Sequence, residues 1–208
     1  MEIIKLTSSF FYVNAYLLVN SQGEAILIDA PPESAEQIME ILKQKDLLLK
    51  KIILTHGHWD HICDAFKVKD QTQAELMIHS LDSHYLTDKK SHDFMMFPII
   101  LDEIQPDVLL NGDEIITLAE IELKVLHTPG HSAGGICLYT ERFESLFSGD
   151  TIFQASVGRT DFPDGNHGDL ISSIKEKLFT LPDATDIFPG HGDKSTIEFE
   201  KNHNSFLR

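Results

Sequence analysis

At residues 55–61 the chain reads Thr55-His56-Gly57-His58-Trp59-Asp60-His61. Four side chains that can bind a metal ion fall within six consecutive residues of this stretch. His56 and His58 are two residues apart, so in an extended segment their side chains point to the same side. The spacing differs from the His-Glu-x-x-His motif of zinc proteases, in which both histidines lie on one helix. We therefore expect these ligands after the strand Lys51–Leu54, with Asp60 and His61 where the chain turns into a helix.

Three later segments repeat this arrangement of an apolar strand, a Gly or Pro turn and a polar side chain. The side chains that follow these strands are His131, Asp150 and His191. In α/β proteins, ligand sites gather at the carboxyl ends of strands. The pattern therefore predicts that four strand ends deliver five histidines and two aspartates to one edge of the sheets.

The types of these side chains indicate a metal centre. Imidazole and carboxylate ligands without a thiolate suit zinc, iron or manganese. Two divalent cations about 3.5–4 Å apart need about three protein ligands each and a bridging carboxylate. We therefore predict two divalent metal ions per chain, most simply Zn²⁺, with Fe or Mn also compatible. The predicted ligands are His56, His58, Asp60, His61, His131, Asp150 and His191.

Other residues with reactive side chains have more ordinary interpretations. Cys63 and Cys137 cannot form a disulfide framework or a cysteine-rich metal site, and Cys63 is expected to be buried. Arg159 is expected to form an ion pair with Asp161 or another carboxylate. Four histidines outside the cluster are expected to be core or surface residues, namely His79, His84, His92 and His203. His127 and His167 stay open, because His127 opens the turn that presents His131 and is a candidate to support that ligand.

Composition and charge limit the possible partners. The chain has 208 residues, with 17 Lys and Arg against 33 Asp and Glu, a net charge of −16. This charge disfavours nucleic acids and anionic membranes as partners. It does not exclude a small anionic substrate, because bound metal ions would set the local field. No apolar run approaches the ~20 residues of a membrane span, and the N-terminus does not read as a signal peptide, so we expect a cytoplasmic protein.

Strand-like and helix-like segments alternate, which favours two sheets with helices outside, a layered α/β sandwich. Residues 1–208 are expected to form one domain, because ligands from both halves must converge. Ser34 is expected to cap a helix that carries Ala35 and Leu42, and a second helix is expected at Asp169–Phe179. The segment Asp88–Pro106 is expected to be a loop, and its apolar residues at 94–97 are expected to form either a wall over the site or part of the core. The expected strands are Phe11–Val19, Glu24–Ile28, Lys51–Leu54, Leu76–Ile78, Glu114–Leu118, Ile121–Leu126, Gly135–Tyr139, Ser145–Phe147 and Asp186–Phe188.

The residues at 56–61, followed by His131, Asp150 and His191, resemble the motifs of the metallo-β-lactamase superfamily. The resemblance covers nearly the whole chain and implies an αββα four-layer sandwich with a binuclear site at one edge. It implies that His56, His58 and His131 bind the first metal ion, and that Asp60, His61 and His191 bind the second. By the same resemblance Asp150 bridges the two ions, and Asp29 holds a ligand loop by hydrogen bonds.

Within this superfamily the chain is similar to the glyoxalase II group, through residues 128–132, 147–151 and 189–192. Residues 157–163 resemble its short, single-domain bacterial members. The resemblance implies hydrolysis of a small anionic thioester such as S-lactoylglutathione, by water that the two metal ions activate and Asp60 orients. Only 17 residues follow His191, whereas full-length glyoxalase II has a C-terminal helical domain that binds glutathione. The thiol carrier therefore stays open, as does the oligomeric state.

Other functions are compatible with the same motifs. Iron-dependent persulfide dioxygenases share the stretch Gly158–Phe162 and, by resemblance, use one iron held by His56, His131 and Asp150. Those enzymes tend to continue with Asp-Tyr after the last histidine, whereas this chain continues with Gly192-Asp193, which favours the hydrolase. A non-catalytic metal-binding or partner-binding module, and hydrolysis of lactones or phosphodiesters, are further alternatives.

Overall fold

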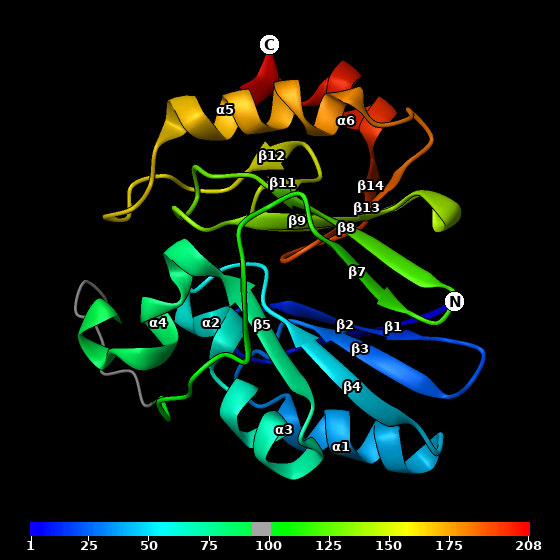
Figure 1. Ribbon diagram of the computed structural model, residues 1–208. Coiled ribbons are helices and arrows are strands. Elements are labelled where there is room, and N and C mark those ends of the chain that lie inside the picture. Colours follow the sequence, from blue (N-terminus) through cyan, green and yellow to red (C-terminus); the bar gives the residue numbers. More distant parts are fainter. Residues whose placement is uncertain (93–100) are drawn as a thin grey trace.

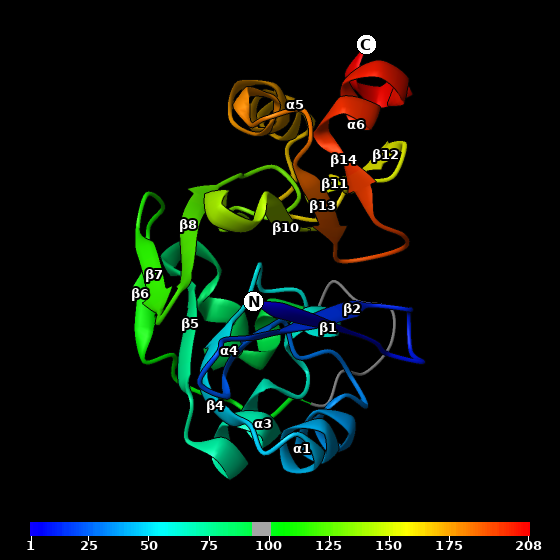
Figure 2. The ribbon, with the colours of Figure 1, turned by 90° about the vertical axis from the view of Figure 1, so that its right-hand side faces the viewer.

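Two six-stranded sheets pack face to face, and helices cover the outer side of each (Figure 1; Figure 2). The computed structural model describes residues 1–92 and 101–208. The first sheet has the order β1-β2-β3-β4-β5-β6 and the second has the order β14-β13-β10-β9-β8-β7. The strands of the first sheet are β1 (Glu2–Thr7), β2 (Asn14–Val19), β3 (Glu24–Ile28), β4 (Leu48–Ile53), β5 (Glu75–His79) and β6 (Val108–Leu110).

The second sheet is formed by the later half of the chain. Its strands are β7 (Ile115–Leu118), β8 (Ile121–His127), β9 (Ile136–Thr140), β10 (Ser145–Gly149), β13 (Asp186–Pro189) and β14 (Ser195–Thr196). A small separate hairpin consists of β11 (Ile152–Phe153) and β12 (Ser156–Val157). Helices α1 (Ala35–Gln44) and α3 (Ala65–Thr72) cover the first sheet, and α5 (His167–Glu176) and α6 (Ile197–His203) cover the second (Figure 1). The short helices α2 (Trp59–Ile62) and α4 (His84–Thr87) lie at the end of the first sheet.

Neighbouring residues of one strand enter different cores, which creates the four layers. On β3, Leu27 packs in the cluster shared with α1 and α3, whereas Ile26 packs between the two sheets. On β10, Phe147 packs between the sheets, whereas Leu146 packs in the cluster shared with α5 and α6. Because successive side chains of a strand point to opposite faces, a strand covered on both sides must be apolar throughout. The αββα fold that the sequence predicts is therefore confirmed.

Two local predictions need correction. The strand expected from Phe11 begins only at Asn14, because Phe11 and Tyr12 have positive φ angles of 61° and 54° and form a turn. Ser34 does not cap α1 with its side chain. Its hydroxyl donates to the carbonyl of Pro31 at 2.6 Å, and the amide of Ala35 instead donates to the Asp64 carboxylate at 3.0 Å.

Several expected segments are found close to their predicted positions. Helix α5 begins two residues earlier than expected, and Leu178 lies in the 3₁₀ turn Leu178–Thr180 that follows it. The predicted wall of residues 94–97 lies outside the described residues, within 93–100.

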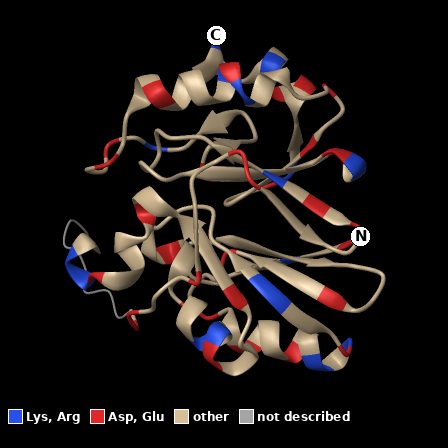
Figure 3. Ribbon diagram, in the orientation of Figure 1, with Lys and Arg blue, Asp and Glu red and all other residues tan. Residues whose placement is uncertain are grey.

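No helix of the described residues is long and apolar enough to cross a membrane. Acidic and basic residues are interspersed along α1 and α3 (Figure 3).

Candidate metal centre

The seven predicted ligands come together at the ends of β4, β8, β10 and β13. Asp150 directly follows β10, whose parallel neighbour β13 leads to His191. His131 follows β8 in the same sheet, and the stretch from His56 to His61 follows β4 in the opposite sheet. Among the described residues, three groups place their ligand atoms within 4.8 Å of one another. These groups are His56, His58 and His131; His56, His61 and Asp150; and Asp60, His61 and His191.

The first group consists of buried imidazoles whose ring nitrogens face each other. His131 Nε2 lies 2.8 Å from His58 Nδ1 and 3.3 Å from His56 Nε2. All three rings are at least nine-tenths buried. Burial and the neighbouring imidazoles lower the pKa of His56 well below its ordinary range, and the pKa of His58 to about 3. These two histidines are therefore neutral at pH 7, which is the form that binds a metal ion.

Asp150 lies among the imidazoles of these groups. Its Oδ1 lies 3.3 Å from His61 Nε2, and its Oδ2 lies 3.5 Å from His191 Nε2 and 3.6 Å from His131 Nε2. Asp60 Oδ2 approaches His191 Nε2 at 3.7 Å. Asp150 thus reaches imidazoles of all three groups, as a bridging carboxylate must.

Burial and charge oppose each other at these acids. Burial raises the pKa of Asp150, but the charges of His61 and His191 outweigh it and hold this pKa well below the usual range. Burial also raises the pKa of Asp60, and His191 and His61 lower it below its usual value. Both carboxylates are therefore ionised at neutral pH and are available as ligands.

The outer nitrogens of four histidines are fixed by hydrogen-bond acceptors. His61 Nδ1 donates to Asp29 Oδ2 at 2.8 Å, and His131 Nδ1 donates to the Arg159 carbonyl at 2.8 Å. His191 Nδ1 donates to the Phe11 carbonyl at 3.1 Å. His56 Nδ1 lies 3.1 Å from the Thr55 hydroxyl, which itself donates to Asp29 and therefore accepts from the ring. In all four rings Nε2 consequently faces inward, where its lone pair can bind a metal ion once the ring is neutral.

The donor set fits two divalent cations. His61 Nε2 and Asp150 Oδ1 are both buried and lie 3.3 Å apart as an ion pair, and within the described part of the chain neither atom has a hydrogen bond. Buried polar atoms without a hydrogen bond are rare and need an explanation. A cation between them satisfies both atoms, and the imidazole and carboxylate donors suit Zn²⁺, Fe or Mn.

A cavity of about 210 Å³ opens over this cluster. Its walls include the aromatic rings of Phe11, Trp59 and Phe162. Arg159 lies at its rim, and the guanidinium carbon is 4.1 Å from the centre of the Phe162 ring. The predicted ion pair of Arg159 is confirmed, because its Nε and Nη2 atoms donate to the two Asp161 oxygens at 2.6 and 2.7 Å.

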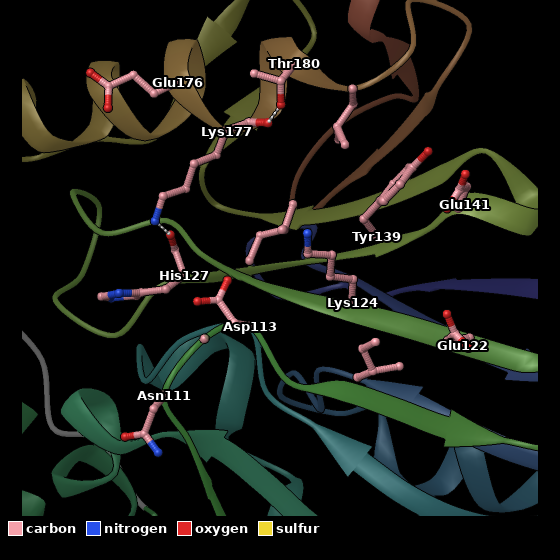
Figure 4. A pocket seen from close by; sticks show the side chains of 14 residues that line it. Asn111, Asp113, Glu122, Lys124, His127, Tyr139, Glu141, Glu176, Lys177 and Thr180 are labelled. Atoms are coloured by element: carbon pink, nitrogen blue, oxygen red, sulfur yellow. Dashed lines mark hydrogen bonds between the residues drawn. The ribbon is translucent and has the colours of Figure 1, made fainter.

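A larger hollow of about 570 Å³ lies elsewhere, between β8, β9 and the end of α5 (Figure 4). It contains none of the seven predicted ligands. Lys177 donates to the backbone carbonyl of His127, and the Thr180 hydroxyl donates to the Lys177 carbonyl at 2.6 Å. The side chains of Lys177 and Thr180 therefore form hydrogen bonds with nearby backbone carbonyls.

The remaining predictions have mixed outcomes. His79 and His92 are buried, and His79 stacks on His127 with ring centres 4.1 Å apart, so these histidines belong to the packing. Cys63 is half-buried rather than buried, and burial raises its pKa to about 11, which keeps the thiol protonated. Sequence reasoning missed Asp82, a fully buried acid beside the first group. Its position after the strand β5 was the available signal.

Residues 9–191 match the family model of the metallo-beta-lactamase superfamily. The chain belongs to this superfamily. The superfamily relative GloC, a hydroxyacylglutathione hydrolase of Haemophilus influenzae, is 36% identical over 209 residues, which cover 100% of this chain and 97% of GloC. The probable metallo-hydrolase YqgX of Bacillus subtilis is 34% identical over 195 residues, which cover 93% of this chain and 92% of YqgX. The superfamily resemblance predicted from the motifs is thus confirmed.

Solved structures of the superfamily share the fold. The B3 metallo-β-lactamase BLEG-1 matches with a TM-score of 0.94 and 35% identity, covering 99% of both chains. ETHE1 from Myxococcus xanthus matches with a TM-score of 0.84 and 27% identity, covering 99% of this chain and 84% of ETHE1. TTHA1623, solved in a di-iron-bound form, matches with a TM-score of 0.82 and 29% identity, covering 98% of this chain and 100% of TTHA1623.

Because Gly190 has no side chain, Asp150 and His61 can pack directly against its backbone. We therefore expect Gly190→Ala to displace these two predicted ligands. A Cβ atom at Gly190 would lie 2.3 Å from Asp150 Oδ1 and 2.7 Å from His61 Cε1. We expect the variant to lose about 1–3 kcal/mol of unfolding free energy through overpacking, and to bind Zn²⁺ more weakly. Denaturant unfolding and Zn²⁺ titration measure both effects.

Gly168 supplies the matched control. It lies in helix α5, and its added Cβ would meet only Asn166 Oδ1 at 3.4 Å. Gly168→Ala is expected to leave Zn²⁺ binding unchanged and to stabilise the helix by up to about 1 kcal/mol. Equal Zn²⁺ affinities for the two variants would contradict the role assigned to the space at Gly190.

Proposed function

We propose that this protein is a metal-dependent hydrolase of small anionic thioesters such as S-lactoylglutathione. The observation that carries the proposal is the inward orientation of the Nε2 atoms of four histidines around Asp150, which suits a binuclear centre. The similarity to GloC supports a thioester as the substrate.

The proposed ligands divide into two sets with one shared member. His56, His58 and His131 would hold the first cation. Asp60, His61 and His191 would hold the second, with Asp150 between the two. Divalent cations held by these residues would lower the pKa of a bound water toward neutrality and would polarise the thioester carbonyl.

The chain's own residues orient the reactants. The ionised Asp60 carboxylate lines the cavity and can accept a hydrogen bond from the attacking water, which aligns a lone pair of the water with the carbonyl carbon. The rings of Phe11, Trp59 and Phe162 exclude bulk water from one side of the substrate. This apolar wall strengthens every electrostatic interaction inside the cavity.

An iron-dependent persulfide dioxygenase is the second candidate. The stretch Gly158–Phe162 supports it, because the sequence resemblance to those enzymes includes these residues. It would use His56, His131 and Asp150 as a two-histidine, one-carboxylate triad. The sequence Gly192-Asp193 after His191 and the full-length similarity to GloC favour the hydrolase.

One set of assays separates these functions. Purified protein is tested for hydrolysis of S-lactoylglutathione, of other acyl thioesters and of a β-lactam, and for oxygen uptake with glutathione persulfide. Metal content is measured on the same sample. Thioester hydrolysis without oxygen uptake supports the proposal. Oxygen uptake with one iron per chain, or β-lactam turnover without thioester turnover, overturns it.

Replacing Asp60 with alanine tests the catalytic role of this carboxylate. We expect kcat for the thioester to fall by about 10²–10⁴-fold, because general acid–base and orienting groups contribute effects of this size. The fold should survive, since Asp60 lies at the cavity wall and circular dichroism would show an unchanged spectrum. Wild-type kcat in Asp60→Ala would show that catalysis does not pass through this residue.

A further inference from the structure

Asp82 is a fully buried carboxylate that the proposed reaction does not use. It ends the 3₁₀ turn Ser80–Asp82, which directly follows β5. Its oxygens accept three hydrogen bonds. Oδ2 accepts from the Gly57 amide at 2.9 Å and from the Ser132 hydroxyl at 2.7 Å, and Oδ1 accepts from the Gly134 amide at 2.5 Å.

These three donors lie in the two loops that carry the first ligand group. Gly57 stands between His56 and His58, and Ser132 directly follows His131. The two loops extend from opposite sheets, so Asp82 connects them across the edge of the sandwich. A Cβ atom at Gly134 would lie 2.6 Å from Asp82 Oδ1, so a glycine is needed there for this close approach.

The two oxygens of a carboxylate match this set of three donors. A carboxylate offers acceptor sites on both oxygens, whereas an asparagine offers one oxygen and one NH₂ group that can only donate. An asparagine at position 82 would therefore place its NH₂ group against at least one of the donors of Gly57, Ser132 or Gly134. A buried donor left without an acceptor is costly, so the loops would move apart.

Asp29 plays a different part at the same edge. It accepts from the amide and hydroxyl of Thr55 at 2.7 and 2.8 Å and from His61 Nδ1 at 2.8 Å. Asp29 therefore contacts His61, a predicted ligand of the second metal position, directly. It reaches His56, a predicted ligand of the first position, only through Thr55. The two buried acids thus support different halves of the cluster.

We propose that Asp82 is a positioning residue for the first metal position, setting the distance between the loop of His56 and His58 and the loop of His131. The inference rests on the proposed binuclear centre and deepens it. Partners outside the ligand shell typically change metal affinity by about 10–100-fold when they are removed. Asp82→Asn should therefore weaken the first position by this factor and leave the second position unchanged.

The experiment measures Zn²⁺ affinity by competition with a chromophoric chelator, in two backgrounds that each disable one position. His191→Ala removes a ligand of the second position and keeps His56, His58 and His131. His131→Ala removes a ligand of the first position and keeps Asp60, His61 and His191. Asp82→Asn is expected to weaken Zn²⁺ binding about 10–100-fold in the His191→Ala background and less than twofold in the His131→Ala background. Asp29→Asn is expected to weaken the second position more than the first.

Two further variants keep the test decisive. Ser132→Ala removes one of the three donors with little change in volume, and a smaller weakening is expected in the His191→Ala background alone. Glu122→Gln, an exposed site on β8, is the neutral control. Equal weakening of both positions by Asp82→Asn, or no weakening in either background, overturns the inference. A parent chain that binds two Zn²⁺ without hydrolysing thioesters overturns the proposed function alone, and one that binds no Zn²⁺ overturns both.

Discussion

Replacing Asp150 with alanine is expected to remove thioester hydrolysis and to lower the number of bound metal ions. The carboxylate oxygens of Asp150 lie 3.3–3.6 Å from the Nε2 atoms of His61, His131 and His191. Both proposed metal positions therefore depend on Asp150. Loss of one charge-stabilising group from an active site costs about 10²–10³-fold in kcat. Because this substitution also removes a shared ligand, we expect a loss at or beyond the upper end of that range.

The measurement combines steady-state kinetics with elemental analysis of Asp150→Ala. Asp183→Ala is the control, since Asp183 is an exposed acid that pairs with Lys201 at 2.6 Å on the surface. The control is expected to keep parental kcat and metal content. An Asp150→Ala protein that retains two metal ions and a kcat within tenfold of the parent would rule out a bridging role.

Removing the metal ions with a chelator is expected to lower thermal stability and abolish hydrolysis. A ligand at 1,000 times its dissociation constant stabilises the folded state by about 4 kcal/mol. For a chain of this size that corresponds to about 10 °C in Tm. Added Zn²⁺ should restore both properties. A chelated sample that keeps parental Tm and activity would contradict the account.

The pH dependence of this effect has a defined sign. Burial lowers the pKa of His191, but the Asp150 and Asp60 carboxylates outweigh it and raise this pKa to about 9 in the metal-free chain. A raised pKa contributes stability that is complete below the unfolded value near 6.5 and is lost as the pH rises through about 9. A shift of this size corresponds to about 3 kcal/mol.

The difference in Tm between metal-loaded and metal-free protein should therefore widen between pH 6.5 and 9. The metal-free Tm should fall, because proton binding to His191 no longer favours the folded chain. The metal-loaded Tm should rise relative to it, because metal ions bind the deprotonated ligands and need not displace protons. Thermal melts at several pH values test this, and parallel curves for the two forms would contradict it.

The ligand cluster could be predicted from the sequence because its signals are local. His56, His58, Asp60 and His61 lie within one short stretch, and each other ligand follows an apolar strand and a turn. Strand ends in layered α/β folds share an edge, so the convergence of these segments follows from general topology.

Features that depend on distant partners could not be predicted. Asp82 follows a predicted strand but has no Gly or Pro turn beside it, and its partners lie 25, 50 and 52 residues away. The start of β2 at Asn14 was also not predicted. Phe11 and Tyr12 continue the apolar pattern of the strand, but their positive φ angles place them in a turn. Ser34 has the residue type of a helix cap, but the hydroxyl bonds to Pro31.

The number of tightly bound divalent cations per chain, determined by elemental analysis on a sample assayed in parallel with S-lactoylglutathione, tests the central claim most directly. We expect two zinc, iron or manganese ions per chain, and thioester hydrolysis that rises and falls with their occupancy. Full thioester hydrolysis by a chain that holds one ion or none would contradict it.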